Sequence, residues 1–305
     1  MNGMQAGMVR IGINPITWMN DDMPELGGDI PLDTCLAETK QAGYAGTEMG
    51  GRFPKTAAAL RPMLEGHGLQ LVSGWFDGRI KEREVAAEWD AILPHLTLLR
   101  DMGCRHVVYA DVTGGRHGDI ARKLSDRPKL SGEDWPEYGR KVTALAERMA
   151  AFGVGMAFHH HMGTIVQTGA EIDALMLHTG AAAGLLFDSG HCLFAGADPL
   201  AVLMRHVERV VHVHCKDVRP AVMDKALGFD WSFMHSVLKG VYTVPGDGCI
   251  EFMPLLETLR DADYGGWLVV EAEQDPRIAH PLTYARMGFG YLASAAEEAG
   301  FEVEE

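Results

Sequence analysis

The sequence predicts an α/β protein folded as a (β/α)8 TIM barrel, and three observations support this prediction. Short apolar, β-rich segments alternate with longer amphipathic segments, which is typical of parallel strands joined by helices. There are eight such pairs, the number that closes a barrel. The chain has 305 residues and no recognisable linker, so a single domain over 1–305 is expected.

The expected strands are short runs rich in apolar and β-branched residues: Val9–Ile13, Gly46–Met49, Gln70–Gly74, His106–Ala110, Gly155–His159, Ala183–Asp188, Val210–His214 and Trp267–Glu271. Segments with helical periodicity follow them: Leu32–Ala42, Ala57–Gly66, Glu82–Met102, Trp135–Phe152, Ala170–His178, Pro199–His206, Phe252–Asp261 and Pro281–Ala299. Glycines come directly after several of these segments, as expected at helix C-termini.

An open doubly wound sheet is the alternative to a barrel. Such a sheet usually carries a glycine-rich phosphate turn after its first strand, but here 14–18 read Asn-Pro-Ile-Thr-Trp. The barrel is therefore favoured. Its two longest expected loops, 111–130 and 218–249, would lie over the carboxyl ends of the strands and are candidate lids.

Composition and charge exclude several classes of protein. The formal net charge of −15 repels a phosphate backbone, so nucleic acid is not an expected partner. No apolar stretch approaches the roughly 18 residues of a membrane span, and the N-terminus does not resemble a secretory signal, so we expect a cytoplasmic protein. Five widely spaced cysteines are typical of free thiols in a reducing compartment.

Four consecutive expected strands end in side chains that can bind a metal ion. Side chains two residues apart on a strand share a face, so the pairs 159/161, 212/214 and 271/273 would each point the same way. Asp, His and Glu from neighbouring strands could then converge on one ion. The candidates, in strand order, are His159 and His161, Asp188 and His191, His212 and His214, and Glu271 and Glu273.

Simpler roles are open for several of these residues. Asp188 precedes Ser189 and Gly190 and could be a helix N-cap. His212 lies in an apolar strand, where a hydrogen-bonded core histidine is the favoured interpretation. His160 should face away from its neighbours and pack between barrel and helices. Asp217, Glu273 and Asp275 are most simply solvated loop charges, and Cys215 is most simply an inert core thiol.

Longer motifs surround these strand ends, at 14–22, 46–50, 159–164, 187–191, 212–219 and 244–248. They resemble the xylose isomerase-like barrel superfamily, whose sugar epimerases, isomerases and dehydratases bind Mn²⁺, Co²⁺ or Mg²⁺ at the ends of strands five to eight. The resemblance covers nearly the whole chain. Within the superfamily it is to the inosose dehydratases (2-keto-myo-inositol dehydratases).

This resemblance implies a divalent metal, Mn²⁺ or Co²⁺, bound by Asp188, His214 and Glu271. His159 stands where the superfamily has its first glutamate. The implied reaction is metal-dependent dehydration of 2-keto-myo-inositol to a trihydroxycyclohexane-dione in inositol catabolism, with a ketose epimerase or isomerase as the alternative. The resemblance also brings in glutathione as a thiol cofactor, although no motif points to it.

The histidine at position 159 bears on the type of reaction. Epimerases of this kind use two carboxylates, one on each face of the substrate carbon, and His159 removes that symmetry. An elimination needs one base and an unlike acid. We assign Glu271 as the base, and His191 or His161 as the acid, because imidazole titrates near neutral pH. For His159 itself, metal binding, acid catalysis and orientation of the substrate all remain open.

Six further residues are candidates for substrate binding. Trp18, Trp75 and Tyr109 lie at strand ends, where an aromatic face could pack on a sugar-like ring; filling the core is the alternative. Glu48, Lys216 and Arg219 could bind substrate hydroxyls or the carbonyl, or form structural ion pairs. The expected partner is a small polyhydroxylated ketone. The oligomeric state is open, a homo-oligomer included. A metal-dependent phosphodiesterase and a non-catalytic sugar-binding barrel are less favoured alternatives.

Overall fold

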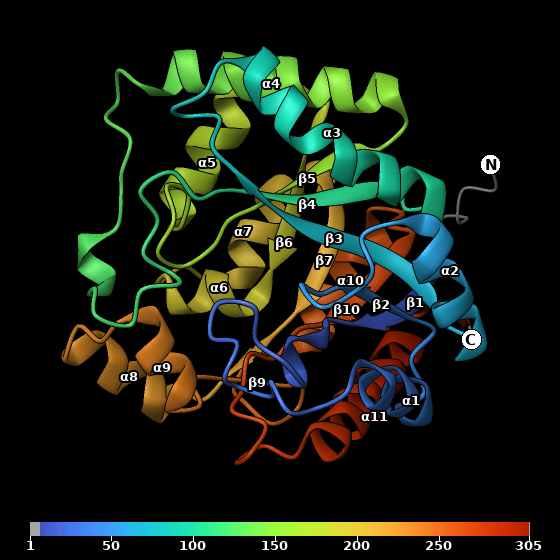
Figure 1. Cartoon of the computed structure of the whole chain (residues 1–305). Coiled ribbons are helices and arrows are strands. Elements are labelled where there is room, and N and C mark those ends of the chain that lie inside the picture. Colours follow the sequence, from blue (N-terminus) through green and yellow to red (C-terminus); the bar gives the residue numbers. More distant parts are fainter. Residues whose placement is uncertain (1–6, 305) are drawn as a thin grey trace.

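The computed structural model describes residues 7–304 and shows a closed barrel of parallel strands (Figure 1). Each strand pairs with the next, and the last pairs with the first through Val9–Ile13 and Gly266–Val270. The strands are β1 (Met8–Ile13), β2 (Gly46–Met49), β3 (Gln70–Gly78), β4 (His106–Asp111), β5 (Gly155–His159), β6 (Ala183–Asp188), β7 (Val210–Cys215) and β10 (Gly266–Val270). The predicted TIM barrel is confirmed.

Helices cover the outside of the barrel, as Figure 1 shows. Gly103 and Gly153 follow two of them at φ 86° and 104°, the left-handed conformation in which glycine ends a helix without strain. In the described range, no helix has the length and apolar character needed to cross a membrane. The helices that follow the barrel strands are α1 (Leu32–Ala42), α2 (Ala57–Gly66), α3 (Val85–Met102), α4 (Trp135–Phe152), α5 (Gly169–His178), α7 (Pro199–His206), α10 (Phe252–Asp261) and α11 (Pro281–Glu298).

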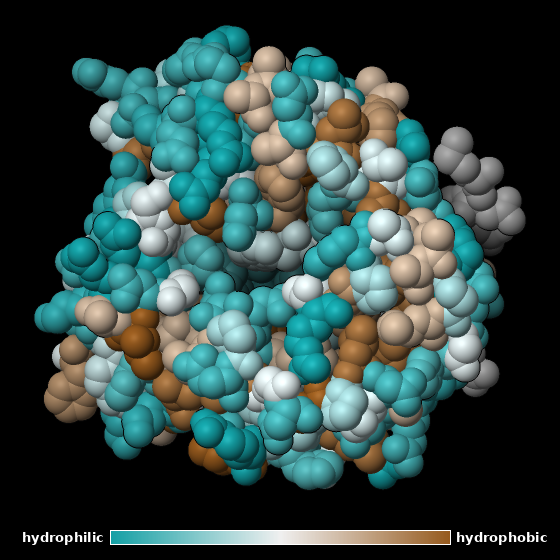
Figure 2. Space-filling view, in the orientation of Figure 1, coloured by the Kyte–Doolittle hydropathy of each residue, from teal (hydrophilic) through white to brown (hydrophobic). Residues whose placement is uncertain are grey.

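The main hydrophobic core lies between the strands and these helices. A second, smaller cluster of Val108, Ala157 and Leu186 lies in the barrel. Ala157 and Leu186 come two residues before His159 and Asp188 on the same strands, so they share a strand face with those side chains. The surface in Figure 2 is mostly hydrophilic and is hollowed near its centre.

Several short elements were not predicted, because they span too few residues to show a period. A helix begins directly after β6, and the segment after β7 contains two helices and a small antiparallel pair of strands. A final strand, close to the C-terminus, pairs in parallel with the first three residues of β1. These elements are α6 (Ser189–Phe194), β8 (Asp217–Val218), α8 (Pro220–Gly228), α9 (Phe233–Leu238), β9 (Tyr242–Thr243) and β11 (Glu302–Glu304).

The two candidate lid loops contact each other. The Leu124 amide donates to the Trp231 carbonyl (3.2 Å), and the Ser125 hydroxyl donates to the Asp230 carboxylate (2.6 Å). Figure 1 shows the loop before α4 running beside α8 and α9. The long loop after β4 and the insertion after β7 thus support each other, and movement of one relative to the other would break these contacts.

Asp217 organises the end of this insertion, and the solvated role suggested for it is wrong. The residue is 1% exposed, and its two carboxylate oxygens accept hydrogen bonds at 2.8–3.1 Å from four backbone amides, those of Val218, Gly246, Gly248 and Ile250. One side chain therefore fixes the chain on both sides of 219–245.

We expect Asp217→Asn to lower the free energy of unfolding by about 3 kcal/mol, because a carboxamide nitrogen would face amide donors that a charged acceptor now satisfies. Urea unfolding followed by circular dichroism measures this change. Asp224→Asn, at an exposed position on α8, is the control and should change stability by less than about 0.5 kcal/mol. Equal stabilities of the two variants would contradict the anchoring role.

Candidate active site

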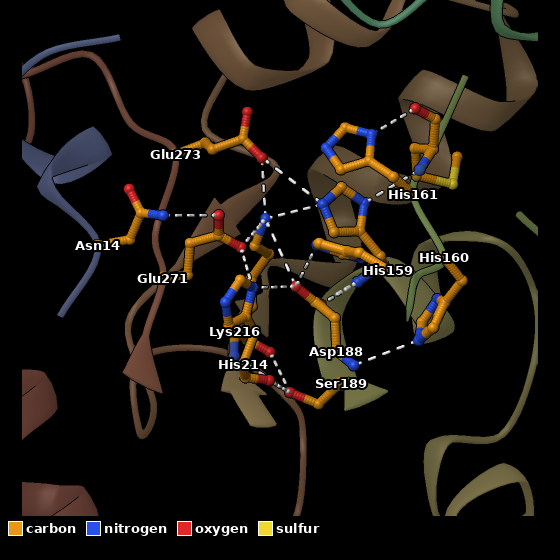
Figure 3. A network of polar contacts seen from close by, with 12 residues as sticks. Asn14, His159, His160, His161, Asp188, Ser189, His214, Lys216, Glu271 and Glu273 are labelled. Atoms are coloured by element: carbon orange, nitrogen blue, oxygen red, sulfur yellow. Dashed lines mark hydrogen bonds and ion pairs between the residues drawn. The ribbon is translucent and has the colours of Figure 1, made fainter. Parts of the chain in front are cut away.

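Four side chains from the ends of β5, β6, β7 and β10 converge at the carboxyl end of the barrel (Figure 3). His159 and Asp188 are the last residues of their strands, His214 lies in β7, and Glu271 follows β10 directly. One nitrogen or oxygen atom from each lies within 4.8 Å of the others, and all four residues are buried. The predicted convergence of Asp188, His214 and Glu271 is thus present, and His159 joins it.

The hydrogen bonding of this group tests whether a metal ion fits. The buried atoms without a hydrogen-bond partner include both ring nitrogens of His159, Asp188 Oδ2, His214 Nδ1 and Glu271 Oε2. His214 Nδ1 is 2.9 Å from Glu271 Oε2, but the two are not aligned for a hydrogen bond. Buried polar atoms without partners are costly, and one shared cation would satisfy Asp188 Oδ2, His214 Nδ1, Glu271 Oε2 and one of the two His159 nitrogens. The mixed N/O donor set suits several divalent ions.

Lys216 lies beside the group and is itself completely buried. Its Nζ is 2.8 Å from Glu273 Oε1, 3.0 Å from Glu271 Oε2 and 3.8 Å from Asp188 Oδ2. Burial alone would lower the pKa of Lys216, but the carboxylates, Glu271 first, raise this pKa above its ordinary value. Lys216 is therefore an ammonium ion in the resting site.

Glu273 was a candidate at the metal-competent strand end, and the simpler interpretation as a solvated loop charge is wrong. It is 2% exposed and paired with Lys216. Burial raises the pKa of the Glu273 carboxyl to about 7, against the opposing effect of Lys216. Asp275 is also largely buried and pairs with Arg277 at 2.7 Å. Alternation along the segment after β10 brings Glu273 to the same side as Glu271.

His191 and His161, the candidate acids, stack against each other with ring centroids 3.9 Å apart. His191 Nε2 lies 2.9 Å from Lys216 Nζ, and Nδ1 lies 2.9 Å from the Tyr242 hydroxyl. Burial, followed by the neighbouring cations, lowers the pKa of both imidazoles well below the ordinary value. Because an ammonium only donates, His191 Nε2 accepts from Lys216, so the proton nearest the site at neutral pH is on Lys216.

Glu48 lies below the four-residue group, at 2% exposure. Its Oε1 is 2.8 Å from His212 Nε2 and 3.2 Å from His214 Nε2, and Oε2 accepts from Asn14 Nδ2 at 2.8 Å. Burial alone would raise the pKa of Glu48, but His214 and His212 lower it to about 2, so the carboxylate is ionised. His212 is confirmed as a hydrogen-bonded core histidine.

The three aromatic candidates lie in different surroundings. Trp75 is partly exposed, and its ring lies 5.6 Å from His159 and 5.4 Å from His161, so it borders the site. Trp18 is buried and donates from Nε1 to Glu38 on α1 (2.6 Å). Tyr109 is buried and donates to Glu88 on α3 (2.9 Å). Filling the core, the alternative given for Trp18 and Tyr109, fits these surroundings.

Arg219 is occupied by its own insertion. Its guanidinium donates to the carbonyls of Gly240 and Tyr242 at 3.0 Å and to the Asp247 carboxylate at 2.8 Å. These bonds hold β9 against the start of α8. A structural ion pair, the alternative to substrate binding, describes this arrangement.

Sequence reasoning missed His117, Asn14 and Tyr242. His117 comes from the long loop after β4, and its ring lies 5.4 Å from His161 and 6.3 Å from Trp75. Its Nδ1 is buried without a hydrogen-bond partner. The position of His117 in a candidate lid was the available signal, whereas the distant pairing of Tyr242 with His191 left none in the sequence.

His160 points away from the group, as predicted, and its Nε2 accepts from the Asp188 backbone amide at 3.2 Å (Figure 3). Burial lowers the pKa of His160 from 6.5 to about 3. Between these two values the unfolded chain binds a proton that the folded chain does not. This group therefore leaves stability unchanged above pH 6.5 and reduces it as the pH falls below.

We expect His160→Gln to reduce the pH dependence of the free energy of unfolding by about 1.4 kcal/mol per pH unit on the acid side of neutrality. Urea titrations at several values between about pH 6.5 and 5 measure the slope. Above pH 6.5 the free energies of unfolding of the variant and of the original protein should change with pH in parallel. If the two free energies also changed in parallel below pH 6.5, His160 would be protonated in the folded protein.

Comparison with curated proteins identifies close relatives over almost the full length. The chain is 62% identical over 295 residues to the "Rhizopine catabolism protein MocC" of Rhizobium meliloti, covering 97% of this chain and 91% of that protein. It is 41% identical over 286 residues to an inosose dehydratase of Geobacillus thermodenitrificans, covering 93% and 96%. An inosose dehydratase of Glaesserella parasuis is 38% identical over 296 residues, covering 96% and 99%.

Solved structures share the fold at low sequence identity. An L-ribulose 3-epimerase aligns with a TM-score of 0.67 at 18% identity, covering 96% of each chain. The IOLI protein with a bound zinc atom aligns with a TM-score of 0.67 at 15% identity, covering 95% of this chain and 99% of that one. The family model described as "Xylose isomerase-like TIM barrel" matches residues 36–295. The chain belongs to the xylose isomerase-like TIM barrel family.

Proposed function

We propose that the protein is a hydro-lyase that dehydrates 2-keto-myo-inositol to a trihydroxycyclohexane-dione in inositol catabolism. The observation that carries this proposal is 38–41% identity to inosose dehydratases over more than 90% of the chain. The site supports it with a base, several proton donors and a possible metal centre in one buried cluster. The substrate is a small polyhydroxylated ketone.

His159, Asp188, His214 and Glu271 would hold the divalent cation, for which we propose Mn²⁺ or Co²⁺. When bound, such an ion polarises a carbonyl and makes the adjacent C–H bond more acidic. The ionised Glu271 takes that proton, because its pKa is held well below the ordinary value by His214 and Lys216 despite burial.

The second half of the reaction expels the neighbouring hydroxyl as water. The bond between carbon and oxygen breaks, and the departing oxygen takes a proton through His191 or His161, which are neutral at rest. Lys216 supplies that proton through its contact with His191 Nε2 (2.9 Å), and the proton that Glu271 removed returns to Lys216 across their 3.0 Å contact. The enol that remains converts to the dione. Trp75 and His117 border the space in which the ring would lie, and we assign them to its binding.

The proposal is tested by incubating the protein with 2-keto-myo-inositol and Mn²⁺ or Co²⁺, with and without glutathione, and following the mass of the product. Loss of one water from the substrate is the expected result. An unchanged mass with altered stereochemistry would support the epimerase instead, and unchanged substrate retained by the protein would support a sugar-binding barrel. Protein stripped by a chelator should regain turnover only after the metal is returned.

A step of rhizopine catabolism is the second candidate, favoured by the 62% identity to the Rhizobium meliloti protein. Both candidate reactions would use the site described above, so the two candidates differ in substrate. Parallel incubations with rhizopine and with 2-keto-myo-inositol, compared by kcat/KM, separate them. A higher kcat/KM for rhizopine than for 2-keto-myo-inositol would support the second candidate and contradict the first.

A further inference from the structure

Glu48 makes a connection across the interior of the barrel. It lies on β2, whereas its partners His212 and His214 lie on β7, which is not a neighbour of β2 in the sheet. The third partner, Asn14, follows β1 and donates to Glu48 Oε2 at 2.8 Å. Three strands thus determine the position of one carboxylate.

Both oxygens of this carboxylate already accept hydrogen bonds from protein side chains. Oε1 already accepts from His212 and His214, and Oε2 accepts from Asn14. The residue is 2% exposed, and His212 beyond it lines a cavity at the opposite, amino-terminal end of the barrel together with His106 and Trp267. Glu48 therefore lies under the proposed metal site and not at its open side.

The contact with His214 selects one form of that imidazole. A carboxylate only accepts, so His214 Nε2 must carry the hydrogen. Nδ1 is then the nitrogen whose lone pair a cation can take up, and it lies 3.6 Å from Asp188 Oδ2 and 2.9 Å from Glu271 Oε2. Metal-binding histidines are commonly oriented by a carboxylate on the second nitrogen in this way.

We propose that Glu48, itself held by His212, is a positioning residue that prepares His214 Nδ1 for the cation, and that it is not a substrate ligand. This inference rests on the proposed function only in requiring a divalent ion at His214. It replaces the expectation that Glu48 binds a substrate hydroxyl. Its consequence is measurable as metal affinity, independently of turnover.

The decisive experiment is calorimetric titration of chelator-stripped protein with Mn²⁺. Glu48→Gln should weaken binding by about 10- to 100-fold, because the carboxamide can turn its NH₂ toward His214 and no longer enforces one tautomer. His212→Leu, which removes a donor that holds Glu48, should weaken binding in the same direction. If Glu48→Gln does not fold, His212→Leu carries the test alone.

Glu88→Gln is the matched control. Glu88 is also a completely buried carboxylate, but it bonds Tyr109 and the Arg79 amide on the outer side of the barrel. The Glu88→Gln variant should bind Mn²⁺ with a dissociation constant within about twofold of that of the unaltered protein. Equal weakening in both glutamine variants would mean general loosening of the fold and would overturn the inference.

Kinetics separate positioning from substrate binding. At saturating Mn²⁺, Glu48→Gln should recover most of its kcat with an unchanged KM for 2-keto-myo-inositol. A raised KM at saturating metal would show that Glu48 binds the substrate. Unchanged Mn²⁺ affinity in Glu48→Gln would refute the positioning role and would leave the dehydratase proposal intact. If the unaltered protein binds no Mn²⁺, both the metal centre and this inference fail.

Discussion

Replacement of Asp188 by asparagine is expected to lower kcat/KM for 2-keto-myo-inositol by about 10³-fold or more. Asp188 Oδ1 accepts from the His191 amide as the N-cap of α6, while Oδ2 faces the metal-binding group. The oxygen of an asparagine side chain can still accept from the His191 amide. In that orientation its NH₂ group takes the place of Oδ2 and faces the metal-binding group. A bound metal contributes several kcal/mol to the transition state, and 1.36 kcal/mol corresponds to a factor of ten in rate.

Steady-state kinetics with added Mn²⁺ measure this effect, and Asp198→Asn is the control. Asp198 caps α7 in the same manner, accepting from the Leu200 amide at 2.9 Å, but lies on the surface away from the strand ends. Its replacement should change kcat/KM by less than about twofold. If Asp188→Asn retained full activity, neither the metal centre nor the proposed mechanism could stand.

Replacement of Lys216 by methionine is expected to destabilise the metal-free protein by about 3–5 kcal/mol and to abolish most of the activity. The side chains have similar size, so little packing is lost. The ammonium, however, is the buried cation shared by Glu271, Glu273 and Asp188, and removing one member of a buried ionic group leaves the others uncompensated.

Urea unfolding of chelator-stripped protein measures the loss, and addition of Mn²⁺ should recover part of it by neutralising the same carboxylates. Lys123→Met is the control, since Lys123 pairs with Asp230 at 3.8 Å with 63% of its side chain exposed. Exposed pairs contribute at most about 1 kcal/mol. A Lys216→Met protein as stable as Lys123→Met would show that the carboxylates are already protonated.

Periodicity predicted the regular elements well. The strands β2, β5 and β6 and the helices α1, α2, α4, α7 and α10 have the bounds expected from the sequence alone. Their apolar faces are set by local chemistry, because each must be buried against the same closed sheet. The short elements α6, α8 and α9 were missed because one or two turns carry no measurable period and depend on neighbouring segments.

The site was predicted only in part, because strand patterns place side chains on a face but do not give their partners. Side-chain alternation and strand ends were enough to bring Asp188, His214 and Glu271 together. Alternation placed Glu273 on the same face as Glu271 but gave no indication of its pairing with Lys216. It also gave no indication that Trp18 and Tyr109 would turn toward helices and not toward the open end of the barrel. Those outcomes depend on how far each strand extends and on what packs against it.

The sequence by itself determined the barrel, the position of the metal-competent residues at its strand ends and the family. Only the tertiary structure decided which atoms meet: that Lys216 supplies the buried positive charge, that Tyr242 reaches His191 from the insertion after β7, and that Glu48 crosses the barrel to His214. The physical reason is range. Strand and helix periods are local properties of the chain, whereas buried charges choose partners by proximity in space, and residues such as Glu48 and His214 are 166 positions apart.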